Sequence, residues 1–128
     1  MSDLTDYGES AVANHFFRGV STTATAAHVG LLTAAPSESA PGTEVSGGSY
    51  ARVAAGFGAP SPAGVIGNAS AVVFPTASGS WGTVTHVGLY DAASGGNLLA
   101  FKALAASVPV STGQQPQFAS GALTVTVQ

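Results

Sequence analysis

Cysteine is absent from this chain of 128 residues, and charged side chains are few, with three Lys or Arg and six Asp or Glu. Without cysteine the chain has no disulfide, no thiolate metal site and no thiol nucleophile. Three basic side chains are too few to neutralise a run of phosphates or to hold the chain on an anionic membrane. We therefore expect neither nucleic acid nor membrane as a partner.

Long hydrophobic runs are missing as well. No apolar stretch approaches the length of about 18 residues that a membrane-spanning helix needs. The first ten residues, MSDLTDYGES, are acidic and polar, whereas a secretory signal is basic and then apolar, so we expect no export.

Small residues dominate what is present. Ala, Gly, Ser and Thr together make up more than half of the chain, and charged residues make up 7%. A free monomer usually keeps more surface charge than this, and interface cores are depleted in charge. The length predicts one domain, residues 1–128, and the composition favours a compact unit with much of its surface covered by partners.

One helical pattern occurs, over residues 4–18. Asp6 and Glu9 have the spacing of a capping box, and Val12 and Phe16 lie four residues apart on one face. Gly19 is a natural stop.

After Gly19 the pattern is that of β-structure. Short β-branched or aromatic runs alternate with turn residues and predict strands at 26–34, 49–57, 70–75, 82–91, 97–105 and 121–127, with a further candidate at 107–111. In the 82–91 strand, alternation assigns Val84, His86 and Tyr90 to one face. Residues 35–48 contain few large apolar groups and predict an exposed loop. The expected fold is a mostly β, single-domain antiparallel β-sandwich, jelly-roll-like, with one short N-terminal helix.

A short internal echo involves two of the three histidines. Residues 28–31 and 86–89 both read HVGL, and each is followed by a pair of alanines. The two histidines could form a paired site, or the two strands could meet similar packing demands; we favour the second interpretation.

Motifs for catalysis are lacking. No histidine lies in a local metal-ligand motif, no pair of carboxylates is singled out, and no GxSxG elbow or phosphate-binding glycine loop occurs. We expect no enzyme activity, no catalytic residue, no cofactor and no metal. Arg52 is expected to pair with Glu44 or Asp91. Trp81 either caps one end of the core, which we favour, or offers a surface aromatic.

Four segments carry a family resemblance. Residues 44–52 read EVSGGSYAR, residues 73–77 VFPTA, residues 81–92 WGTVTHVGLYDA and residues 95–99 GGNLL. In these strings the chain resembles a family of small virion structural proteins of tailed bacteriophages, described as head decoration, minor tail or tail-fibre proteins. The resemblance implies a non-enzymatic β-sandwich that associates with itself and with other virion proteins.

The first functional hypothesis that follows is a capsid decoration (cement) protein, made in the host cytoplasm and bound as a homotrimer to the major capsid protein on the capsid surface. The alternative is a minor tail or tail-fibre protein that binds other tail components or a host surface. A third hypothesis is a carbohydrate-binding module that uses Trp81 and Tyr90. The predicted contact residues come from the helix, the 35–48 loop and one aromatic: Leu4, Tyr7, Phe17, Glu38, Glu44 and Trp81.

Overall fold

The computed structural model describes residues 4–20, 27–59, 61 and 64–126. Helix α1 spans Asp6–Phe17, within the predicted range. Its N-cap is Thr5, whose hydroxyl accepts a hydrogen bond from the backbone N–H of Gly8, so the predicted Asp6–Glu9 capping box is wrong. Thr5 is buried, and its hydroxyl also donates to the Leu98 carbonyl. The helix ends at Arg18, and Gly19 follows with a φ of 67°.

The larger sheet has five antiparallel strands: β1 (Ala27–Ala34), β2 (Thr43–Glu44), β3 (Val53–Ala55), β6 (Gly82–Tyr90) and β7 (Leu98–Val110). Their order is β2-β1-β6-β7, and β3 pairs with the other half of the same edge of β1. β7 is therefore an edge strand, and the proline at position 109 is typical of such an edge.

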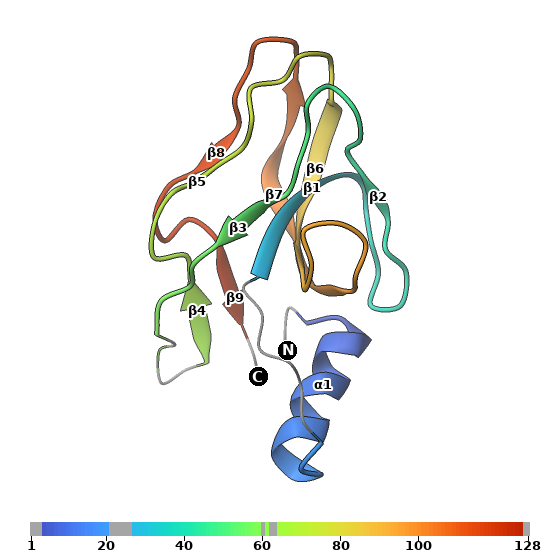
Figure 1. The fold of residues 1–128 in the computed structure, drawn as a ribbon, viewed down its shortest axis with the longest axis vertical. Coiled ribbons are helices and arrows are strands. Elements are labelled where there is room, and N and C mark those ends of the chain that lie inside the picture. The colour runs from blue at the N-terminus through green and yellow to red at the C-terminus, as the bar shows by residue number, and fades with distance from the viewer. Residues whose placement is uncertain (1–3, 21–26, 60, 62–63, 127–128) are drawn as a thin grey trace.

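Two small antiparallel pairs form the second layer. β4 (Val65–Gly67) pairs with β9 (Thr124–Thr126), and β5 (Val72–Val73) pairs with β8 (Gln117–Phe118). Both pairs lie on one side of the larger sheet (Figure 1). The core between the layers joins aliphatic and aromatic residues of both: Val29, Leu31, Val84 and Val87 from the sheet, with Val72, Phe74 and Leu123 opposite. The structure is thus a mostly β, antiparallel sandwich with one N-terminal helix, as predicted.

The strand predictions at 26–34 and 82–91 are confirmed by β1 and β6. The predicted strands 97–105 and 107–111 are one strand, β7. The runs at 49–57, 70–75 and 121–127 contain only the short strands β3, β5 and β9, and the sequence did not predict β2, β4 or β8. Strands of two or three residues are too short to show an alternation of side chains.

The prediction that 35–48 is wholly an exposed loop is wrong in part. Its second half contains β2, and Val45 is buried in the core at 4% exposure. A single valine among small polar residues gives no periodic signal, yet the Val45 N–H donates to the Leu31 carbonyl of β1 and the side chain joins the core.

The β6–β7 pairing contains a large irregularity. Val84 pairs with Val108 and His86 pairs with Ala103, so residues 104–107 of β7 stand opposite the single residue Thr85. The alternation of buried side chains along β6 is interrupted at the same place, between Val84 and Val87. Val84 consequently joins Val87 in the core, and its predicted place on one face with His86 and Tyr90 is wrong.

Candidate functional site

Arg52 is the centre of a polar cluster on the outer face of the larger sheet. Its Nε donates to Glu44 Oε2 and its Nη2 donates to Glu44 Oε1, each at 2.8 Å, so the pair is bidentate. The Arg52 side chain is only 8% exposed and that of Glu44 is 25% exposed. The predicted ion pair of Arg52 with Glu44 is confirmed, and its geometry is that of the stronger class of charge-assisted hydrogen bonds.

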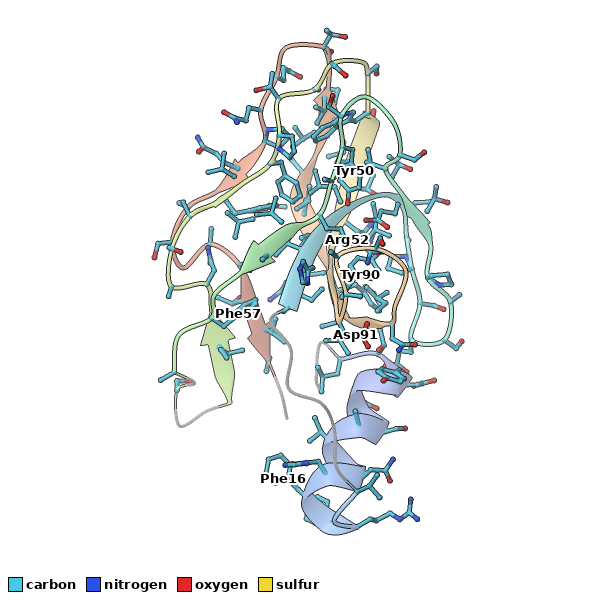
Figure 2. The ribbon with its side chains drawn as sticks, in the orientation of Figure 1. Phe16, Tyr50, Arg52, Phe57, Tyr90 and Asp91 are labelled. Carbon is cyan, nitrogen blue, oxygen red and sulfur yellow. The ribbon has the colours of Figure 1, made fainter. Side chains whose placement is uncertain are left out.

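The same guanidinium holds the turn between β6 and β7. Arg52 Nη1 donates to the backbone carbonyls of Ala92 at 2.9 Å and Gly95 at 2.8 Å. Its central carbon lies 3.5 Å from the ring centroid of Tyr90, a cation–π arrangement. Figure 2 shows Arg52, Tyr90 and Asp91 beside this turn. Arg52 directly precedes β3, so its side chain joins this part of the chain to β2 and to the β6–β7 turn.

Asp91 stabilises the β6–β7 turn by hydrogen bonds between its two ends. Its Oδ1 accepts from the backbone N–H of Asn97 at 2.7 Å, and its Oδ2 accepts from the Asn97 amide at 3.1 Å. The Asn97 N–H is the first cause of a lowered pKa of Asp91. A side chain at Gly96 would collide with Asp91 Oδ1, and its φ of 70° also favours glycine. The segment DAASGGN is thus explained as a turn.

Tyr50 links the cluster to the core. Its hydroxyl donates to Glu44 Oε2 at 2.6 Å and accepts from the Leu31 N–H at 3.0 Å, while its ring packs against Phe74 and Trp81. Burial, and then the hydrogen bond to the Glu44 carboxylate, raise the pKa of Tyr50. Burial alone would raise the pKa of Glu44, but hydrogen bonds from Arg52 and Tyr50 and the charge of Arg52 hold it below its usual value. Both oxygens of the Glu44 carboxylate accept hydrogen bonds, which suits a structural role and not a role as general acid or base.

The HVGL echo has a structural explanation. The two copies lie on neighbouring strands and pair with each other antiparallel, with Gly30 directly opposite Gly88. A Cβ at Gly30 would lie 2.8 Å from a ring atom of Tyr90 and 2.9 Å from the Tyr50 hydroxyl oxygen; a Cβ at Gly88 would lie 3.1 Å from Tyr90. The two glycines therefore leave the space in which the Tyr90 ring lies. Similar packing demands, the favoured interpretation, account for the echo.

The histidines of the echo do not share a site. His28 is opposite Tyr90 in the β1–β6 register, and His86 is opposite Leu32, four residues along. His86 Nδ1 lies 2.8 Å from Thr85 Oγ1, and His28 Nδ1 is buried without a hydrogen-bond partner. Within the described part of the chain, no three His, Cys, Asp or Glu side chains are grouped as metal ligands.

Helix α1 is attached at its first turn and exposed beyond it. The Thr5 hydroxyl donates toward the Leu98 carbonyl at 2.6 Å, and the Thr5 N–H donates to Leu99. Gly8, the only buried residue of the helix, lies against the Leu99 carbonyl. The far end projects away from both layers, with Phe16 72% exposed and Phe17 85% exposed (Figures 1 and 2). We call these two phenyl rings the helix knob.

The irregularity in β7 builds an apolar groove at the other end of the molecule. The β7 groove is a hollow of about 410 Å³ whose walls include Leu104, Val108 and Phe118, with Ala105 and Ala106 between them. Val108 is 47% exposed. Short alanines next to longer aliphatic side chains leave the hollow open, and no charged side chain lines it.

A second, more polar hollow of about 370 Å³ lies between the start of α1, residues 37–41 and residues 96–98. Tyr7 and Glu38, two of the predicted contact residues, line this hollow. The Asp6 N–H donates to the Glu38 carbonyl at 3.1 Å, which ties the first turn of the helix to the 35–48 segment.

The other predicted contact residues lie elsewhere. Leu4 forms a β-bridge with Ala100, Phe17 is the most exposed large apolar residue described, and Glu44 is held by Arg52 and Tyr50. Trp81 is 4% exposed, and its Nε1 donates to the Gly48 carbonyl at 2.8 Å, so the interpretation of Trp81 as a core residue is confirmed. The structure brings Tyr7 and Glu38 to one surface. The sequence did not predict Phe16 or Val108 as contact residues, because an apolar residue in a helix or strand can be buried as readily as exposed.

One family of known proteins matches this chain. The model of the family described as podophage GP4 fiber I protein gp80 matches residues 3–126, nearly the whole chain. The chain belongs to this family. A search of the curated proteins finds no match. In the part of the chain that the structure describes, no helix has both the length and the apolar character of a membrane-spanning segment.

The fibre family identifies the chain as a bacteriophage virion structural protein, as the resemblance implied. The segments 44–52, 81–92 and 95–99, which carried the resemblance, supply the members of the Arg52 cluster, and Arg52 contacts Glu44, the Tyr90 ring and the backbone of the β6–β7 turn. The resemblance therefore includes residues that build the fold. The helix knob lies outside those segments, and of the groove residues only Val84 lies in them.

Proposed function

We propose that this protein is a component of a phage tail fibre and that it acts by assembly and not by catalysis. The observation that carries the proposal is the match of a podophage fibre family over residues 3–126. The family's description favours the tail over the capsid surface, so of the two virion hypotheses we adopt the tail-fibre one.

The distribution of polar and apolar groups supports an assembly role. The most strongly hydrogen-bonded ionisable groups, Glu44, Arg52 and Asp91, are directed at each other or at backbone atoms of the same chain. The exposed surface carries large apolar side chains at the helix knob and beside the β7 groove. Apolar surface of this kind is typical of contacts between subunits, whose cores are depleted in charge. We therefore infer partners that are copies of this chain and neighbouring virion proteins.

The two aromatic residues proposed to bind a carbohydrate, Trp81 and Tyr90, are both buried. A sugar stacks on an exposed aromatic face, but Trp81 lies in the core and the Tyr90 ring, 5% exposed, is covered by Arg52. Any glycan contact of the fibre would have to use other residues of this chain or another chain.

The number of copies per particle tests the tail assignment. Quantitative mass spectrometry of purified virions compares this chain with the major capsid protein. We expect a copy number that is a small fraction of that of the capsid protein, because a tail carries few fibres. A copy number close to that of the capsid protein or its trimers would contradict the tail assignment and restore the capsid decoration hypothesis.

A further inference from the structure

The helix knob and the β7 groove are complementary surfaces that one molecule cannot bring together. The knob is at the tip of α1, whereas the second half of β7 and β8, which line the groove, lie toward the opposite end of the molecule (Figure 1). The first turn of α1 is fixed to β7 by Thr5 and Gly8, so the helix cannot swing across the sandwich without breaking these contacts.

We propose that the helix knob of one copy inserts into the β7 groove of a second copy of this chain. The proposal rests on the role of the protein as a multi-copy virion component and specifies how the copies join. The contact is head-to-tail, so each chain gives its helix to one neighbour and its groove to another.

The chemistry of the two surfaces agrees with this contact. Phe16 and Phe17 are the two most exposed large apolar residues described, and the groove is lined by aliphatic and aromatic side chains with one amide and no charge. Its volume of about 410 Å³ is within the range of pockets that bind small ligands. Residues 104–106 line it, and they belong to the part of β7 that has no partners in the β6 ladder.

The arrangement of apolar residues on α1 disfavours the main alternative, a bundle of parallel helices. Such a bundle needs one apolar stripe along the helix. Here Val12 and Phe16 share one face, but Tyr7 and Phe17 point away from it, and the two most exposed groups are gathered at one end. This distribution suits insertion of a helix tip.

The area involved predicts a closed assembly. A phenylalanine buries about 150–250 Å², so the two exposed rings offer roughly 250–400 Å² at one contact. A stable interface needs about 800 Å² from each partner. One knob in one groove falls short of this, so a single contact is weak and an isolated dimer is disfavoured. In a closed ring every chain makes two such contacts, one with its knob and one with its groove. Ring closure also makes the last contact intramolecular, which strengthens the whole.

Because the chain has no cysteine, single thiols can be introduced to test the contact in the purified full-length protein. Arg18→Cys, beside the helix knob, and Ser107→Cys, beside the groove, are both exposed positions that leave Phe16, Phe17 and Val108 intact. The two variants are prepared separately, mixed, and treated with a short flexible bismaleimide. We expect a dimer that contains one copy of each variant, abundant in the mixture and scarce with either variant alone. An Arg18→Cys and Ser94→Cys mixture is the control, because Ser94 is exposed in the turn before β7.

Sedimentation velocity of matched variants gives the second measurement. Val108→Asp places a charge in the groove, and Val73→Asp places one at a comparably exposed valine outside it, 42% against 47% exposed. We expect Val108→Asp and Phe17→Ser to reduce the assembled fraction at least tenfold while their circular dichroism stays unchanged, and Val73→Asp to leave assembly intact. A monomeric native chain, efficient linking of Arg18→Cys to itself, or assembly that survives Val108→Asp would overturn the proposal. The copy number of the protein per virion does not enter this test, so the two proposals fail separately.

Discussion

Replacing Arg52 with alanine removes the residue that joins β2, the approach to β3 and the β6–β7 turn. The change breaks the bidentate pair with Glu44, two hydrogen bonds to backbone carbonyls and the contact with the Tyr90 ring. Glu44 keeps only its bond from Tyr50. A carboxylate that is largely enclosed is then left without its counter-charge, which is the costly outcome for an ion pair.

The burial of the pair sets the magnitude. Removal of one partner from a buried ion pair costs about 3–5 kcal/mol, whereas an exposed pair contributes about 0–1 kcal/mol. Arg52 is 8% exposed and Glu44 is 25% exposed, so some water reaches the carboxylate and we expect the lower end, about 3 kcal/mol. For a domain of this size that loss lowers the melting temperature by roughly 10–15 °C.

The assay is urea unfolding at a fixed protein concentration, so that any self-association contributes equally to each variant. Lys102→Ala is the matched control, because it also removes a cation, one whose Nζ donates to Thr124 at an exposed position. We expect this control to change the free energy of unfolding by no more than about 0.5 kcal/mol. The double variant Arg52→Ala/Glu44→Ala should lose less than the sum of the single losses by at least about 1 kcal/mol. A loss below about 1 kcal/mol for Arg52→Ala, or strict additivity, would refute the reasoning.

Three further predictions use the same unfolding assay. Folding lowers the pKa of Glu44, so stability should fall as the pH drops below about 5. Folding raises the pKa of Tyr50, so stability should also fall as the pH rises above about 10. A stability that does not change with pH at either end would contradict these two directions. Gly30→Ala should cost about 1–3 kcal/mol, because its Cβ would lie 2.9 Å from the Tyr50 hydroxyl and from Glu44 Oε2. Its control, Gly56→Ala, places a Cβ with no atom within 4 Å and should be nearly neutral. Equal losses of stability in the two variants would be inconsistent with this packing. Thr5→Ala should cost about 1–2 kcal/mol and reduce the helical signal in circular dichroism, and Thr5→Ser should restore both; an unchanged spectrum in Thr5→Ala would show that the cap is dispensable.

The sequence was most informative where strands are long. β1 and β6 have eight and nine residues, enough for alternation and β-branched content to locate them. β2, β4 and β8 have two or three residues each and depend on long-range pairing, which a local pattern cannot contain. The face of Val84 was assigned wrongly for a related reason, since the alternation along β6 is interrupted beside three extra residues in the partner strand β7.

Of the candidate site, only the Glu44–Arg52 ion pair was predictable from the sequence. Opposite charges eight residues apart suggested the Glu44–Arg52 pair, but nothing local indicated that Tyr50 and Tyr90 would complete it. The two glycines that admit the Tyr90 ring were visible as an echo, although their direct pairing needed the strand register. The helix knob and the groove were hidden because exposure of an apolar residue depends on what packs against it, and the sequence does not specify that partner.

The position of this chain on the particle tests the central claim most directly. A small tag fused to the chain, detected by gold labelling and electron microscopy of intact virions, reports that position without any assumption about copy contacts. The account predicts label confined to the tail fibres at one vertex of the head. Label distributed over the capsid surface, with none on the tail, would contradict it.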